Sequence, residues 1–147
     1  MAWKMKLVAP WEGMTAIWNV SHQVGVHAKC MNATDDVELV QQLICSIHQQ
    51  GAPTTRSPGI GVLRATTGRM DALTAFEILW GDAVVYEPED DGIISPAKMG
   101  LVSYGANYWA IARLNLELFR RNRPYWESLP ERCSPSLKSN LLTKTSP

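Results

Sequence analysis

The sequence predicts a mainly α-helical protein of one domain, with an N-terminal β-hairpin and an extended C-terminal arm. Three observations predict this fold: a well-signalled amphipathic helix over residues 32–51, further apolar residues at helical spacing over residues 71–80 and 104–119, and a strand-like alternation before residue 21. A chain of 147 residues buries enough surface to fold without disulfides or metals. We divide it into residues 1–23, 24–122 and 123–147.

Residues 1–23 are expected to form a β-hairpin arm. Apolar residues alternate with lysines over residues 3–7, and a second alternation covers residues 16–20. Between them, Pro10 to Gly13 supply turn chemistry. An isolated hairpin is marginal in water, so this one must pack on the helical body or add to the sheet edge of a partner.

The clearest element is a helix within Asn32–Gly51. Asp35 is expected to act as its N-cap, with Glu38 three residues later completing a capping box. Gly51 is a typical stop signal. One face carries apolar residues at spacings of three and four, namely Val37, Val40, Leu43, Ile44 and Ile47.

Two loops rich in turn residues or acidic residues flank a second helix. A Gly, Pro and Thr-rich loop follows Gly51, and the second helix is expected from Asp71, as N-cap, to Trp80. An acidic loop over residues 82–92 comes next.

A third helical region is expected from Ser95, as N-cap, to the residues before Pro124. Gly100 and Gly105 weaken its start, which predicts a kink or two pieces near residues 103–106. Its apolar stripe comprises Tyr104, Tyr108, Ile111, Leu114, Leu118 and Phe119. The proline-punctuated residues 123–147 are expected to lie over a surface as an extended arm.

Charge and composition exclude several classes of protein. The 14 basic and 14 acidic residues give a net charge of zero, without the electrostatic footprint of a dedicated nucleic-acid or anionic-membrane binder. Neither a secretory signal nor an apolar run long enough to span a membrane is found. Three scattered cysteines fit a reducing compartment, so we expect synthesis in the cytoplasm.

A cluster of arginines toward the end of the third predicted helical region is the one feature that suggests binding of nucleic acid. We call this cluster the basic end. Its arginines are interleaved with aromatic residues, as in a stacking surface for single strands. Ordinary capping cations at a helix C-terminus explain the same residues, so we expect no nucleic acid. The arginines are Arg113, Arg120, Arg121 and Arg123.

Two chemical sites compete with ordinary structural roles. His27, Cys30, Cys45 and His48 follow a spacing compatible with tetrahedral zinc, although Cys45 adjoins the apolar face of its helix. Cys30 could also pair with His22 or His27 as an activated nucleophile, but no orienting carboxylate stands at a recognisable spacing. We therefore predict no catalytic residues, metal or cofactor. Whether His27, Cys30, Cys45 and His48 bind a metal is left open.

Six tryptophans are more than a core of this size requires. Tryptophan and tyrosine are the usual anchors of protein interfaces. The interface candidates are Trp3, Trp11, Trp18, Trp109, Tyr125 and Trp126.

The segment VGVHAKCMNATDDVELVQQLI resembles the opening of the small peptidoglycan-binding domain found in phage particles and contractile injection systems. The fold-defining positions of this resemblance are Val24, Gly25, Asn32, Asp36, Val37, Val40, Gln41 and Leu43. TGRMDALTAFEILW resembles the second helix of the family through Gly68, Asp71, Thr74, Ile78 and Trp80. DGIISP (91–96) and ARLN (112–115) resemble its later elements. The resemblance covers roughly residues 24–120 and implies a compact three-helix bundle.

These expectations combine into one functional hypothesis. The chain would be a non-enzymatic structural component of a phage or phage-like tail or injection particle, made without a signal peptide and incorporated into the virion. It would dock onto other structural proteins, as a homo- or hetero-oligomer, through its terminal arms. The alternative is a peptidoglycan-binding module that positions a separate lytic enzyme.

Overall fold

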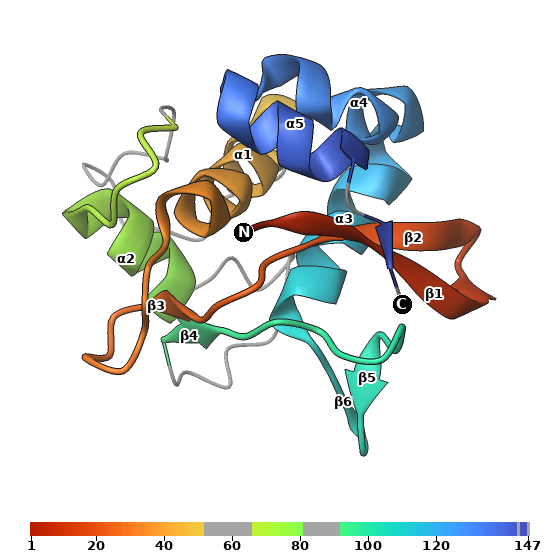
Figure 1. Ribbon diagram of the computed structural model, residues 1–147, viewed down its shortest axis with the longest axis horizontal. Helices are drawn as coiled ribbons and strands as arrows, with labels where there is room; N and C mark the ends of the chain where they lie inside the picture. Colours follow the sequence, from red (N-terminus) through yellow and green to blue (C-terminus); the bar gives the residue numbers. More distant parts are fainter. Residues whose placement is uncertain (52–65, 81–91, 144, 147) are drawn as a thin grey trace.

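The computed structural model describes residues 1–51, 66–80, 92–143 and 145–146. The fold is mixed α/β, with helices above and around a long β-hairpin (Figure 1). The helices are α1 (Thr34–Gln49), α2 (Ala72–Trp80), α3 (Ala110–Arg121), α4 (Arg123–Glu127) and α5 (Pro135–Thr143), with a short 3-10 helix η1 (Leu129–Arg132). The strands are β1 (Trp3–Trp11), β2 (Met14–Asn19), β3 (Val24–Gly25), β4 (Ile93–Ile94), β5 (Ser103–Tyr104), β6 (Asn107–Tyr108) and β7 (Thr145–Ser146).

The predicted N-terminal hairpin is present. β1 and β2 pair antiparallel around a turn at Glu12 and Gly13, both of which have positive φ. The short β7 adds to the other edge of β1 in parallel, so the sheet order is β2-β1-β7. Met5 and Leu7 are buried, whereas Val8 is exposed. The hairpin is therefore part of the core and not a free arm.

Helix α1 is central, but it does not start as predicted. Ala33 precedes it and makes no side-chain cap, so the assignment of Asp35 as N-cap was wrong. The Asp35 carboxylate instead accepts hydrogen bonds from the Ser136 hydroxyl and the Asn140 amide of α5. All residues from 36 to 47 are buried, because α1 contacts β2, β3, α3 and α5 and keeps no free face over this length.

Glu38 also acts on α5 and not on its own helix. Its carboxylate accepts from the backbone N–H of Ser134 at 2.7 Å and from the Ser134 hydroxyl at 2.6 Å. A carboxylate at this position stabilises the unpaired amides and the positive end of the following helix. The first turn of α1 therefore fixes the start of α5. By contrast, Asp71 caps α2 as predicted, since its carboxylate accepts from the Thr74 N–H at 2.7 Å.

The third helix starts later than predicted, with Trp109 and not Ser95 as its N-cap. Residues 95–109 form a turn and the β5–β6 hairpin, and α3 starts only at Ala110. Gly100 and Gly105 have φ of +70° and +57°, a left-handed conformation that no α-helix accommodates. Tyr104 and Tyr108 consequently leave the apolar stripe, while Ile111, Leu114 and Leu118 remain in the core.

The predicted extended C-terminal arm was wrong, because residues 123–143 are largely helical. Prolines stand at the starts of these short helices, where no amide hydrogen bond is lost. Leu129, Leu137 and Leu141 are fully buried, in the same core cluster as Met5 of β1 and Leu43 of α1. One core thus includes residues from all three predicted segments. The architecture is mixed α/β and differs from the three-helix bundle that the resemblance implied.

A buried asparagine joins the sheet to the helices. The Asn115 side chain of α3 accepts from the Trp18 N–H and donates to the Trp18 carbonyl, both at 2.8 Å. The Asn115 side-chain oxygen also accepts from the Trp126 indole N–H at 3.0 Å. We call such a two-bond pairing of one amide side chain with the N–H and the carbonyl of one residue a carboxamide clamp. Asn19 forms a second carboxamide clamp on Ala97, at 3.1 and 2.9 Å.

Replacing Asn115 with alanine is expected to destabilise the protein by about 3 kcal/mol, because the Trp18 N–H and the Trp126 indole would be left buried without partners. Chemical denaturation measures the free energy of unfolding. Asn107→Ala is the control, since Asn107 is exposed on β6, and its effect should stay within about 0.5 kcal/mol. Equal stabilities would contradict a role of the clamp in stability.

The role of α5 in the core is tested by two adjacent leucines. Leu141→Ala is expected to lose about 3 kcal/mol of unfolding free energy, because the side chain is fully buried. Leu142 is 57% exposed, and its replacement by alanine should change stability by less than about 0.5 kcal/mol. Thermal and denaturant unfolding of both variants would measure the difference. Similar small losses would show instead that α5 is a separable arm.

Candidate aromatic binding surface

The four zinc candidates lie on different parts of the fold. His27 is exposed in the loop after β3, where its carbonyl accepts from the Cys30 N–H. Cys45 and His48 lie on α1, and His48 Nε2 is 3.3 Å from a carboxylate oxygen of Glu77. Within the described residues no three metal-ligating side chains come together. The described residues therefore provide no built metal centre.

Ser21, His22 and Asp36 meet at the entry to α1 but form a structural turn. The buried Asp36 carboxylate accepts from the backbone N–H groups of Ser21 and His22 at 2.9 and 3.1 Å. His22 Nδ1 lies 3.3 Å from both Asp36 Oδ2 and Ser21 Oγ. A catalytic relay uses opposite ring nitrogens for base and orienter, and here one nitrogen faces both. The arrangement anchors the chain between β2 and β3.

The basic end predicted at the end of α3 is neutralised. Each of three arginines forms an ion pair with a glutamate, which leaves little positive charge for phosphates. The pairs are Arg120–Glu12 at 3.0 Å, Arg121–Glu117 at 2.6 Å and Arg123–Glu127 at 2.8 Å.

The interface candidates separate into core and surface residues. Trp18 and Trp126 are buried and pack with ring centroids 5.4 Å apart, while the Trp18 indole donates to the Trp126 carbonyl. Trp3 is half-buried against the core. The Tyr125 ring lies 3.4 Å below the Arg132 guanidinium. These four residues support the fold.

Trp11 and Trp109 are also half-buried against the core, but each contacts an exposed tyrosine that the sequence had assigned to a helix. Trp11 of β1 stacks on Tyr108 with centroids 5.2 Å apart and planes 19° apart. Tyr104 packs on Trp109 with centroids 4.2 Å apart. Tyr104 is 45% exposed and Tyr108 is 41% exposed. We call these four residues the aromatic surface; it lies where the β5–β6 hairpin projects from the body of the molecule (Figure 1).

The two tyrosines are held in place by their neighbours. The Arg113 guanidinium lies 5.2 Å from the Tyr108 ring centroid, a distance typical of a cation–π contact. The Trp109 N–H donates to the Val102 carbonyl at 3.0 Å and closes the hairpin. Rigid, partly exposed aromatic rings are suited to binding, because little side-chain entropy is lost when a partner covers them.

Two glycines were the signal for this surface in the sequence, because glycine is the residue that most readily adopts positive φ. Tyr104 and Tyr108 fit the spacing of α3, which concealed them among core residues. Gly100 and Gly105 interrupt that spacing, and a glycine pair before an amphipathic run is also the signature of turns and hairpins. Treating them as turns would have released both tyrosines from the helix.

The residues that resemble the peptidoglycan-binding domain contact each other. Val24 and Gly25 pair with β4, and Asn32 forms a third carboxamide clamp, on Gly25, at 2.9 and 3.1 Å. The Gln41 side chain accepts from the Thr67 and Gly68 N–H groups, both at 2.9 Å. Asp36 and Val40 are fully buried. These positions therefore link β3, β4, α1 and the entry to α2.

No protein-family model, curated protein or solved structure matches this chain. Among the residues that the structure describes, no helix is long and apolar enough to cross a membrane.

Two thiols are expected to be inert in the folded protein. Burial, with the negative charge of Glu77, raises the pKa of Cys45 to about 11. Burial, with Glu38, raises the pKa of Cys133 to about 12. Because only thiolates react, iodoacetamide at neutral pH should leave both unmodified until denaturant is added, as peptide mass spectrometry would show. Fast labelling of either in the native protein would contradict these environments.

Proposed function

We propose that this chain is a non-enzymatic structural component of a phage or phage-like tail or injection particle, and that it docks onto a neighbouring protein through the aromatic surface. The observation that carries the proposal is the pair of exposed tyrosines, each packed on a tryptophan. Tyrosine and tryptophan dominate the binding energy of protein interfaces. The two rings thus present a preformed contact area.

The location of the docking residues differs from the first expectation. Trp18, Trp126 and the leucines of α5 belong to the core, so removing either terminal segment would remove core residues along with any contact. The aromatic surface combines two exposed tyrosines, Tyr104 and Tyr108, with Trp11 and Trp109, which are half-buried against the core. Its β5–β6 hairpin extends from the body of the molecule (Figure 1). Docking through this surface needs no part of the fold to detach.

The resemblance to the peptidoglycan-binding domain supports the particle as the setting. Its motif positions fall on residues with clear mutual contacts, such as Asn32 with Gly25 and Gln41 with Gly68. Domains of this type occur in phage particles and injection systems, which is the basis for the proposed assembly.

The second candidate is a peptidoglycan-binding module that positions a separate lytic enzyme. The same resemblance favours it, and an exposed ring such as Tyr104 is suited to stacking on a sugar. The geometry favours a protein partner more, because the Tyr108 ring already contacts both Trp11 and Arg113. Less of this ring is left for a sugar to cover.

The proposal is tested by co-expression with the structural proteins encoded by neighbouring genes, followed by isolation of particles. The double variant Tyr104→Ala/Tyr108→Ala should reduce incorporation at least about tenfold, since the loss of two anchoring rings exceeds about 1.4 kcal/mol. Leu142→Ala, which removes an exposed apolar residue elsewhere, should be incorporated normally.

A parallel sedimentation assay with insoluble peptidoglycan separates the two candidates. Under the particle proposal, the purified protein stays in the supernatant and the double variant is lost only from particles. Pelleting of the wild-type protein, abolished by the double variant, would favour the wall-binding module. Normal incorporation of the double variant into particles would refute docking through the aromatic surface.

A further inference from the structure

A strained turn lies next to the aromatic surface. The Leu101 N–H donates to the Lys98 carbonyl at 3.0 Å, and the two central residues, Met99 and Gly100, have φ of +60° and +70°. Positive φ at both positions is the type I′ pattern, which favours asparagine, aspartate or glycine. An L-residue such as methionine costs roughly 1–2 kcal/mol in this conformation. We call Lys98–Leu101 the methionine turn.

Met99 recovers none of this cost by burial, because it is 76% exposed. A flexible, polarisable methionine is typical of surfaces that adapt to binding partners. Non-glycine residues in strained conformations concentrate at ligand contacts. The conformation and the exposure therefore both indicate that Met99 contacts a partner.

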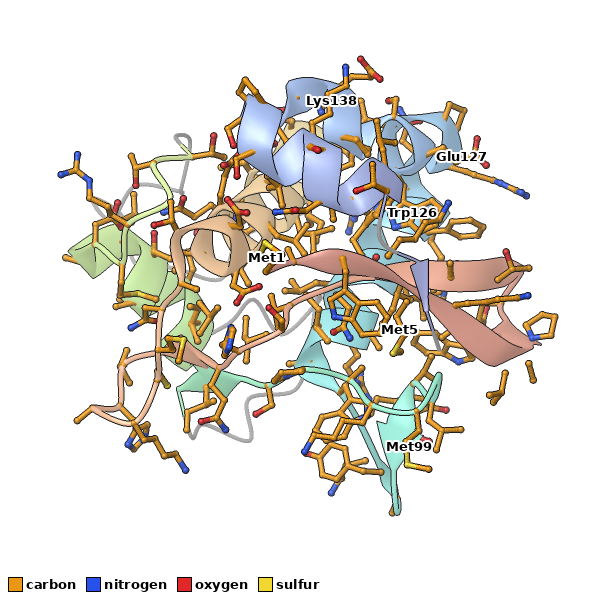
Figure 2. The ribbon with its side chains drawn as sticks, viewed as in Figure 1. Met1, Met5, Met99, Trp126, Glu127 and Lys138 are labelled. Atoms are coloured by element: carbon orange, nitrogen blue, oxygen red, sulfur yellow. The ribbon has the colours of Figure 1, made fainter. Side chains whose placement is uncertain are left out.

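The methionine turn and the aromatic surface are joined through β1. The Val8 N–H donates to the Gly100 carbonyl at 3.0 Å, and three residues further along the strand Trp11 stacks on Tyr108. Val8 is 67% exposed. Figure 2 shows Met99 beside the β5–β6 hairpin. Together these residues extend the aromatic surface into a longer apolar region.

Within the part of the chain that the structure describes, three cations lie in or beside this region. Lys6 and Lys98 are exposed, and Arg113 lies over Tyr108. The nearest acid on β1's turn, Glu12, is already paired with Arg120 at 3.0 Å. A complementary ligand must supply acceptors and negative charge.

We propose that the aromatic surface and the methionine turn together bind an acidic protein segment that carries apolar side chains. The apolar side chains cover Met99 and the tyrosines, and the flanking carboxylates lie near Lys6 and Lys98. The combination of tyrosine, tryptophan, methionine and arginine is the composition enriched in protein interfaces. This inference rests on the proposed docking function and specifies the partner's chemistry.

The test is selection from a library of random short peptides displayed on a carrier, with the wild-type protein as bait. Enriched peptides should carry aspartate or glutamate beside aliphatic or aromatic residues. Their affinity should fall about tenfold or more in Lys98→Glu and weaken with salt. Lys29→Glu, an exposed charge change in another loop, should retain binding.

Met99→Asn distinguishes contact from folding. Asparagine tolerates positive φ, so the melting temperature should stay the same or rise, while peptide affinity falls about fivefold or more. Equal peptide binding by Met99→Asn and wild type, or enriched peptides without excess acid, would overturn the inference. Binding of wild-type protein to anionic phosphatidylglycerol vesicles in place of peptides would also overturn it. If incorporation into particles still required Tyr104 and Tyr108, the docking proposal would survive that failure.

Discussion

The structure depends on the satisfaction of buried backbone groups by three asparagine side chains. Asn115, Asn19 and Asn32 each form a carboxamide clamp on one residue of another segment, namely Trp18, Ala97 and Gly25. Asn115 and Asn19 are fully buried, where an unpaired amide group costs about 1–3 kcal/mol. Each clamp is satisfied only in one relative position of its two segments. The clamps thus fix β2 against α3, β2 against the segment at Ala97, and β3 against the loop before α1, positions that hydrophobic contact alone does not specify.

Local signals in the sequence predicted the elements whose residues decide their own structure. The hairpin alternation, the apolar face of α1 and the Asp71 cap of α2 all correspond to the structure, because each depends on neighbours a few residues away. For Asp35 and Glu38, by contrast, the local pattern predicted the wrong partners. Both match a capping box by spacing, yet their carboxylates bind Asn140 and Ser134, about a hundred residues later in the chain. Nothing in the local spacing reveals a partner so distant.

The candidate site was predicted only in part, for a related reason. Six tryptophans indicated an interface. They could not separate Trp18 and Trp126, which are buried where Asn115 of α3 bonds to both, from Trp11 and Trp109, which are half-buried beside exposed tyrosines. Tyr104 and Tyr108 satisfied the helical period with Ile111 by coincidence. The deciding factor was the positive φ of Gly100 and Gly105, a backbone property that composition suggests without proving. The short C-terminal helices were missed because their prolines, read as breaks, stand at helix starts.

The clamps also determine how the surface is presented. Asn19 bonds to Ala97, the residue immediately before the methionine turn. The neighbouring Trp18 bonds to Asn115 of α3, the helix that follows Trp109. Both ends of the segment from 97 to 115 are therefore anchored to adjacent residues of one strand. The Val8–Gly100 hydrogen bond adds a third attachment between them. A segment fixed at its ends and at one point between loses little conformational entropy when a partner covers it. The strain at Met99 is then sustained by the surrounding attachments, so that the same buried amides that stabilise the core keep the exposed rings in position for binding.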